Sequence, residues 1–213
     1  MKKLFQRLTG QVPATSDGPG ANDSGFFSTL FEEAGEEAQA RVGWAARARQ
    51  VNAQPFDRAR GAELFGWLWN DDRHLASLSG TELARMGAYL EFAQIAPNQE
   101  VIGQNEQGDY LLVVLEGTLA VDRVQPWGGR ARLAEAHAGD MLGEMSLLDA
   151  GARFSACTTL TPTTVAVLDA QRLDEMIAQE PRLATALLAS LSRRLSLRLR
   201  QVSARLSALL SRS

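Results

Sequence analysis

The residues with the clearest chemistry in this sequence are Glu144, preceded by Gly143, and Arg153, nine positions later. A ribose-phosphate ligand needs an acceptor for its hydroxyl group and a cation for its phosphate, and this pair supplies both. Arginine suits a phosphate because its planar guanidinium donates two parallel hydrogen bonds. Residues 145–148 between them can form a short helical turn whose free N–H groups favour an anion. The alternative is an ordinary surface loop, because short motifs occur by chance.

The segments on both sides of this motif are typical of short β-strands. The run from Tyr110 to Leu115 is apolar, and after Gly117 a second candidate strand extends from Thr118 to Arg123. Many short strands separated by turn residues favour a jelly-roll barrel over a parallel sheet. The other candidate strands are a pair around a turn within 93–102, and the runs 154–159 and 163–168.

In these residues the chain resembles the cyclic nucleotide-binding domain family, that of the catabolite activator protein and the regulatory subunits of cyclic-nucleotide-dependent kinases. The resemblance covers roughly residues 75–200 and rests on Gly108-Asp109, Gly117, Ala138-Gly139-Asp140 and the spacing from Gly143-Glu144 to Arg153. It implies that Glu144 binds the ribose hydroxyl, that Arg153 binds the cyclic phosphate, and that nearby amides contact the phosphate oxygens. The ligand-binding residues expected in this way are Gly143, Glu144, Met145, Ser146, Arg153, Phe154, Ser155 and Arg198.

Two positions depart from the family pattern. The residue after the arginine is usually small in this family because it lies against the phosphate, whereas here it is Phe154. Phe154 can face the barrel core, stack on a base or close the pocket, and Ser155 restores a hydroxyl one place later. Asn105 replaces a usual glycine, and asparagine tolerates the left-handed backbone that a turn requires.

The C-terminal segment carries a regular apolar stripe. After Glu180 the chain has no acidic residue, and apolar side chains recur every three or four positions. This spacing predicts one long amphipathic helix. Its length favours a homodimer helix, like the one that pairs two subunits in the activator family; the alternative is that it folds back onto the same barrel. The stripe consists of Leu188, Leu191, Leu195, Leu199, Val202, Leu206 and Leu209.

Arginines accompany this stripe, and such a basic band is most often a solvated face. Alignment of Arg193-Arg194 with a similar pair in the activator family places Arg198 near the position that contacts the base. Arginine prefers the paired acceptors of guanine to the mixed edge of adenine. cGMP and cyclic di-GMP are therefore alternatives to cAMP, and nucleic-acid binding by the arginine-rich helix is a further alternative.

The expected fold class is α+β, a β jelly-roll barrel with N-terminal helices and a long C-terminal helix. We expect a flexible segment at 1–35, a helical region at 36–90 with helices over 36–50, 57–69 and 83–90, the barrel at 91–170, and C-terminal helices at 171–213. Ser79 or Thr81 caps the helix over 83–90. Trp44, Trp67 and Trp69 are expected in the core.

Two apolar clusters near the N-terminus pack either on the chain's own domain or on a partner protein or membrane. The first consists of Leu4, Phe5 and Leu8, and the second of Phe26, Phe27, Leu30 and Phe31.

Composition restricts the class of protein. The chain has 213 residues, a net charge of −3 and a pI of about 5.5, so no overall basic field attracts nucleic acid or an anionic membrane. The single Cys157 lies in a candidate strand, where we expect a free buried thiol, which indicates a reducing cytoplasm. Neither a signal peptide nor a membrane span is expected, and membrane association is unlikely on this composition.

Catalysis is not expected. The two histidines, His74 and His137, lie far apart in the sequence, and no spacing indicates a metal or another cofactor. No helix-turn-helix follows the leucine stripe, so direct DNA recognition is not expected either.

We expect a homodimeric, non-enzymatic sensor of cAMP or cGMP that signals through a separate protein partner. The alternatives are a cyclic di-GMP effector, a ligand-free scaffold whose pocket Phe154 closes, and a nucleic-acid binder. For the sensor, Arg153→Ala should abolish binding and leave unfolding of the free protein nearly unchanged.

Overall fold

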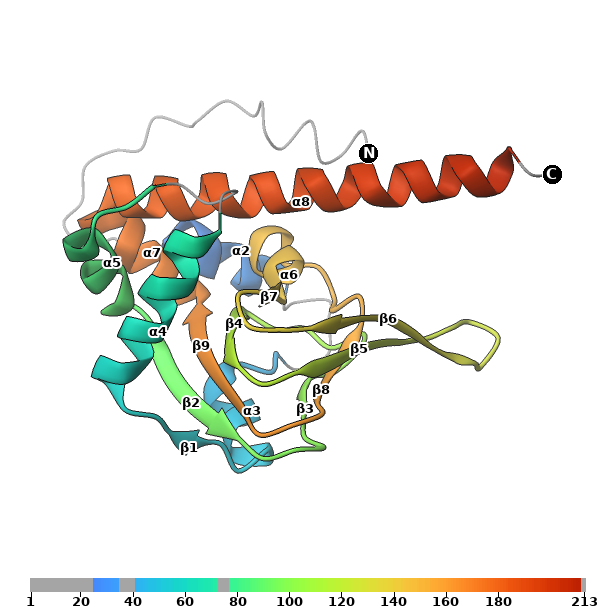
Figure 1. The fold of residues 1–213 in the computed structure, drawn as a ribbon, viewed down its shortest axis with the longest axis horizontal. Coiled ribbons are helices and arrows are strands. Elements are labelled where there is room, and N and C mark those ends of the chain that lie inside the picture. Colours follow the sequence, from blue (N-terminus) through green and yellow to red (C-terminus); the bar gives the residue numbers. More distant parts are fainter. Residues whose placement is uncertain (1–24, 35–40, 73–76, 212–213) are drawn as a thin grey trace.

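Two antiparallel sheets form the centre of the molecule, in a computed structural model that describes residues 25–34, 41–72 and 77–211 (Figure 1). The first sheet has the strand order β1 (Gln54–Pro55), β2 (Glu91–Ile95), β9 (Thr163–Asp169), β4 (Tyr110–Glu116) and β7 (Met141–Leu142). The second has the order β3 (Glu100–Ile102), β8 (Ala156–Thr159), β5 (Leu119–Val124) and β6 (Arg130–Ala136). This arrangement confirms the α+β jelly-roll fold expected from the sequence.

Strand β4 lies between β9 and β7 and is buried on both faces, which explains its continuous apolar sequence. Because successive side chains point to opposite faces, Leu112 and Val114 belong to the cluster inside the barrel, while Leu111 and Val113 belong to the cluster under the helices. Strand β4 therefore packs on the barrel core with one face and on the helical layer with the other.

The helical layer packs around one shared apolar cluster. It contains Phe31 of α2 (Phe26–Ala34), Leu147 of α6 (Glu144–Asp149), Leu173 of α7 (Ala170–Gln179) and Leu187 of α8 (Pro181–Leu210). The remaining helices are α3 (Trp44–Gln50), α4 (Arg58–Asp71) and α5 (Gly80–Gly87). Helix α6 therefore lies in the same packed layer as α2 and α8, so a displacement of α6 would change the packing of both helices.

Helix α2 is attached to α7 by Asp174. This carboxylate accepts hydrogen bonds from the backbone N–H groups of Phe27 and Ser28 at 2.9 and 2.8 Å and from the Ser28 hydroxyl at 2.8 Å. It satisfies the N–H groups that a helix leaves free at its start. The prediction that the second apolar cluster packs on the chain's own domain is confirmed for Phe27 and Phe31, which are buried, while Phe26 is exposed. The first cluster, Leu4, Phe5 and Leu8, lies outside the described residues.

Helix α8 has two different halves. Leu183, Leu187 and Leu191 are buried against the rest of the chain, whereas Ser196 and every described residue from Leu197 to Ser211 are exposed. In Figure 1 the helix lies across one end of the barrel and extends beyond it. Packing on the same chain is confirmed for the first half of the leucine stripe, and pairing with a second copy stays a prediction for the exposed half. Within the described ranges, no helix is long and apolar enough to cross a bilayer.

Two details differ from the sequence-based expectations, and a third decides between two alternatives. Helix α3 begins at Trp44, so the expected helix over 36–50 is wrong at 41–43, where Val42 donates a backbone hydrogen bond to Gln107 instead. Trp44 and Trp69 are buried as predicted, but Trp67 is 65% exposed, because it points away from the face of α4 that carries Phe65 and Trp69. Ser79 is the cap of α5, where it forms a capping box with Glu82.

Candidate functional site

The guanidinium of Arg153 is buried beneath the start of β4. Its Nη1 donates to the carbonyl oxygen of Gly143 at 2.7 Å, and its Nη2 donates to the carbonyl oxygen of Tyr110 at 2.6 Å. The Tyr110 ring also lies against it, with 4.6 Å between the ring centroid and Cζ. Burial lowers the pKa of Arg153 from its ordinary value. Its Nε has no hydrogen-bond partner among the described residues, so one buried donor is free to meet an acceptor.

Two glycines make room for this guanidinium. A Cβ on Gly108 would lie 2.7 Å from Arg153 Nε, and a Cβ on Gly143 would lie 2.4 Å from its Nη1. Gly143 also has a left-handed φ of 82°, which other residues adopt only at a cost. The glycine before Glu144 is thus needed both for the turn that begins α6 and for the arginine that packs on it.

Glu144 contacts the long helix. Its carboxylate is buried, and its Oε1 accepts a hydrogen bond from Nη1 of Arg198 at 2.7 Å, although the two residues are 54 positions apart. A second pair, Arg194 with Asp72 at the end of α4, lies one turn earlier on α8. The structure therefore brings together Gly143, Glu144, Arg153 and Arg198, as the sequence predicted, but Arg198 pairs with the carboxylate expected to bind the ribose.

Cys157 lies in the apolar cluster inside the barrel, together with Tyr110, whose carbonyl oxygen holds Arg153. It is a free, buried cysteine, and burial raises the pKa of its thiol to about 12. The sequence prediction of a free buried thiol is confirmed.

Phe154 points outward, so one of its sequence-based alternatives is wrong. Its side chain is 53% exposed and therefore does not fill the barrel core, while stacking on a base and closing the pocket stay predictions. The guanidinium of Arg123 on β5 lies over the ring at 3.9 Å from its centroid, and Arg123 Nη1 donates to the Phe154 carbonyl oxygen. The reason is that residues 153 and 154 point in opposite directions, and Arg153 takes the interior position.

The other expected residues surround this centre. Ser146 is buried on α6, Met145 is 45% exposed and Ser155 is half-buried. The sequence did not identify Tyr110, whose carbonyl holds Arg153, or Glu106, whose carbonyl accepts the backbone N–H of Arg153 at 2.8 Å. The only signal for them was the Gly108-Asp109 turn before the strand. Asn105 adopts the left-handed backbone predicted for it, with φ 67°.

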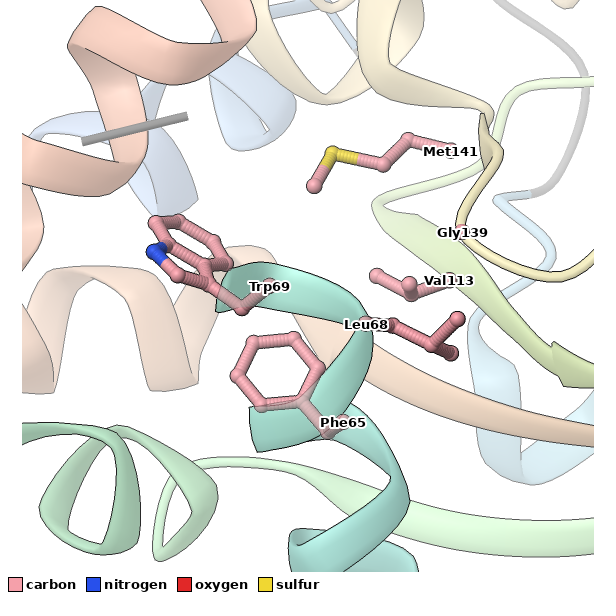
Figure 2. A pocket seen from close by; sticks show the side chains of 6 residues that line it. All are labelled: Phe65, Leu68, Trp69, Val113, Gly139 and Met141. Atoms are coloured by element: carbon pink, nitrogen blue, oxygen red, sulfur yellow. The ribbon is translucent and has the colours of Figure 1, made fainter. Parts of the chain in front are cut away.

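Two hollows elsewhere in the molecule do not include this centre. An apolar recess of about 10 Å³ lies between α4 and strands β4 and β7, lined by Leu68, Val113 and Met141 among others (Figure 2). That volume holds about one water molecule. A polar hollow of about 260 Å³ lies between α3, α5 and the start of α7. Neither hollow is lined by Glu144 or Arg153. In the described part of the chain, no three His, Cys, Asp or Glu side chains cluster as metal ligands.

Sequence comparisons identify the part of the chain that carries the site. Residues 92–180 match the family model of the cyclic nucleotide-binding domain. The chain is 31% identical over 113 residues to a CRP-like cAMP-activated global transcriptional regulator of Mycobacterium tuberculosis, a match that covers 53% of this chain and 50% of the relative. The chain thus spans about half the length of the curated relatives it matches.

Solved structures show the same likeness. A cyclic nucleotide-binding domain from Methylobacillus flagellatus KT is similar with a TM-score of 0.66 and 26% identity, covering 72% of this chain and 85% of that one. The catabolite activator protein of Thermus thermophilus is similar with a TM-score of 0.57 and 26% identity, covering 62% and 61%. Residues 92–180, which contain Glu144 and Arg153, therefore match the cyclic nucleotide-binding domain family in sequence, and the fold agrees with that match.

Proposed function

We propose that this chain is a regulatory sensor that binds a cyclic purine nucleotide, cAMP or cGMP in the simplest case, between Glu144, Arg153 and α8. The observation that carries the proposal is the convergence of a buried carboxylate and a buried guanidinium on one short segment of the barrel. The relative from Mycobacterium tuberculosis is described as cAMP-activated, which supports the choice of ligand class.

Binding would give Arg153 an additional partner and would require Glu144 to exchange one. Arg153 holds two backbone carbonyls and has an unpaired Nε, so a phosphate oxygen offers the acceptor that this guanidinium lacks. Glu144 holds Arg198, so a ribose hydroxyl competes with Arg198 for the carboxylate. Arg198, once released, is free to donate to a purine, and guanine offers it two acceptors.

This exchange would transmit binding to α8. Beyond Arg198 the described part of α8 has no buried residue. The Glu144–Arg198 ion pair connects the beginning of this exposed half to α6, next to the segment that carries Arg153. α8 can take one position with the ion pair formed and another with it broken. A ligand that binds one of these two states more tightly shifts the equilibrium toward it, by as much as its affinities for the two states differ. The proposed role is regulatory and non-enzymatic, and the free thiol of Cys157 suits a cytoplasmic location.

The exposed half of α8 is the proposed output surface. Leu199, Val202, Leu206 and Leu209 are all more than half exposed and follow the spacing of a two-stranded coiled coil. We expect a second copy of the chain to cover this face, with a separate protein partner reading the position of the paired helices. Leu206→Glu should convert the dimer to a monomer in light scattering, and an unchanged mass would contradict this part of the proposal.

The test of ligand binding is a thermal shift with cAMP, cGMP, cyclic di-GMP and cyclic di-AMP. A ligand at about 100 times its dissociation constant adds roughly 2.7 kcal/mol to the free energy of unfolding. Glu144→Ala should remove the shift, while Glu63→Ala, which changes an exposed carboxylate on α4, should retain it. A flat response of the unaltered chain to all four ligands would overturn the proposal.

A further inference from the structure

Arg123 is half-buried and Phe154 is exposed, and their side chains pack on each other outside the apolar core. The Phe154 ring follows Arg153 directly, is 53% exposed and is covered on one side by the Arg123 guanidinium at 3.9 Å. Arg123 Nη1 also donates to the Phe154 carbonyl oxygen, which fixes the guanidinium over the ring. We call these two residues the rim pair.

The register of β5 places the rim pair on the same face as the site. In the β5–β8 ladder Val121 is directly opposite Cys157, and both pack in the cluster inside the barrel that contains Tyr110, whose carbonyl oxygen holds Arg153. Side chains two positions apart on a strand share a face, so Arg123 lies on the side of β5 that carries Val121. The rim pair therefore lies beside the charged centre and farther out along β5.

A cyclic mononucleotide does not need the rim pair. It has one ribose, one phosphate and one base, and Glu144, Arg153 and Arg198 match these three groups one to one. The rim pair adds a second guanidinium and an aromatic ring, held together and half open to solvent. An aromatic ring or a guanidinium plane stacks on a purine, and a guanidinium also pairs with a phosphate.

We propose that the site takes a cyclic dinucleotide of the cyclic di-GMP class, with one nucleotide at Glu144, Arg153 and Arg198 and the second at the rim pair. The purine of the second nucleotide stacks on Phe154, and its phosphate pairs with Arg123. Guanine fits better than adenine because Arg198 finds two acceptors on its edge. This inference rests on the proposed function, since it requires the cyclic-nucleotide site.

The test is isothermal titration calorimetry of cyclic di-GMP and of cGMP, with the full chain and with Arg123→Ala and Phe154→Ala. Each substitution should weaken cyclic di-GMP about tenfold or more, the loss expected for one stacked base or one charge-assisted contact. Binding of cGMP should change less than about threefold, because it does not reach the rim pair. The matched controls are Arg130→Ala and Trp127→Ala, which remove an exposed arginine and an exposed aromatic ring from the same hairpin.

The outcomes separate this inference from the proposed function. Cyclic di-GMP binding that Arg123→Ala and Phe154→Ala weaken selectively, with both controls unchanged, supports the inference. If cGMP or cAMP binds in a manner that depends on Glu144 while cyclic di-GMP does not bind, the proposed function stands and the inference is wrong. Equal weakening of both ligands, or equal effects of Arg123→Ala and Arg130→Ala, also overturns it. If the unaltered chain binds none of the four cyclic nucleotides, both proposals fail.

Discussion

Oε1 of Glu144 and Nη1 of Arg198 lie 2.7 Å apart, so the barrel segment expected to hold a ribose is joined directly to the long helix α8. The carboxylate is buried, whereas the arginine is mostly exposed on the helix surface. In the proposed complex a ribose hydroxyl would compete with Arg198 for this carboxylate, which would link binding to the position of α8.

Removal of Arg198 should loosen α8 in the ligand-free protein. We expect Arg198→Ala to speed amide hydrogen exchange over residues 195–205, because the last contact between this part of the helix and the barrel is lost. Hydrogen-exchange mass spectrometry measures this directly. Arg200→Ala, which removes an exposed arginine from the same turn, should leave exchange unchanged, and equal rates in the two variants would contradict the coupling.

Arg153→Ala should destabilise the free protein by about 3 kcal/mol. The substitution leaves the carbonyl oxygens of Gly143 and Tyr110 without their donor and opens a cavity under β4. These contacts favour a larger loss than the sequence-based expectation, in which unfolding of the free protein is nearly unchanged. Urea unfolding measures the loss, and Arg130→Ala, at an exposed position, should change stability by less than about 0.5 kcal/mol. A similar small change for both variants would show that the buried contacts contribute little.

Gly143→Ala and Gly128→Ala form a matched pair that separates backbone strain from a steric clash. Both glycines have a left-handed φ, 82° and 93°, so alanine costs about 1 kcal/mol of strain at either position. At Gly143 the new Cβ would also lie 2.4 Å from Arg153 Nη1, whereas at Gly128 no atom lies within 4 Å. We expect Gly143→Ala to lose about 2 kcal/mol more in chemical unfolding. Equal losses would mean that Arg153 moves aside freely.

Asp174→Ala should release α2 from α7. This carboxylate accepts three hydrogen bonds at the start of α2, two of them from backbone N–H groups, and loss of such a cap costs about 1–2 kcal/mol. Released α2 exposes Phe27 and Phe31, so limited chymotrypsin digestion should cleave there faster. Gln171→Ala, at an exposed position of the same helix, is the control, and an unchanged cleavage rate in Asp174→Ala would refute the anchoring role.

Cys157 should make stability fall at high pH. Burial raises the pKa of its thiol from 9.0 to about 12, so between these values the folded chain holds a proton that the unfolded chain has lost. The contribution is complete below pH 9 and disappears as pH rises toward 12, by about 1.4 kcal/mol per pH unit at most. The difference in unfolding free energy between the native chain and Cys157→Val, measured from pH 8 to pH 11, isolates this effect from other groups. A difference independent of pH would contradict it.

Local sequence patterns predicted the elements whose cause is local. The apolar run at 110–115 became β4, Ser79 caps α5, and the spacing of leucines after Glu180 became α8. The turn at Asn105 and the glycine before Glu144 also follow from backbone requirements that one residue sets by itself. In these cases the signal and the structure it specifies lie within a few residues.

Only tertiary packing decided how the side chains of the site meet. The sequence identified Glu144, Arg153 and Arg198, but not that Arg198 would pair with Glu144 or that two distant carbonyls would hold Arg153. It also left open the direction of Phe154, which the inward position of Arg153 and the stacking of Arg123 determined. The sequence alone determined the periodicity of strands and helices, because each depends on neighbouring residues. The pairing of charges 54 positions apart depends on which faces of the barrel and α8 pack together, and no local pattern carries that information.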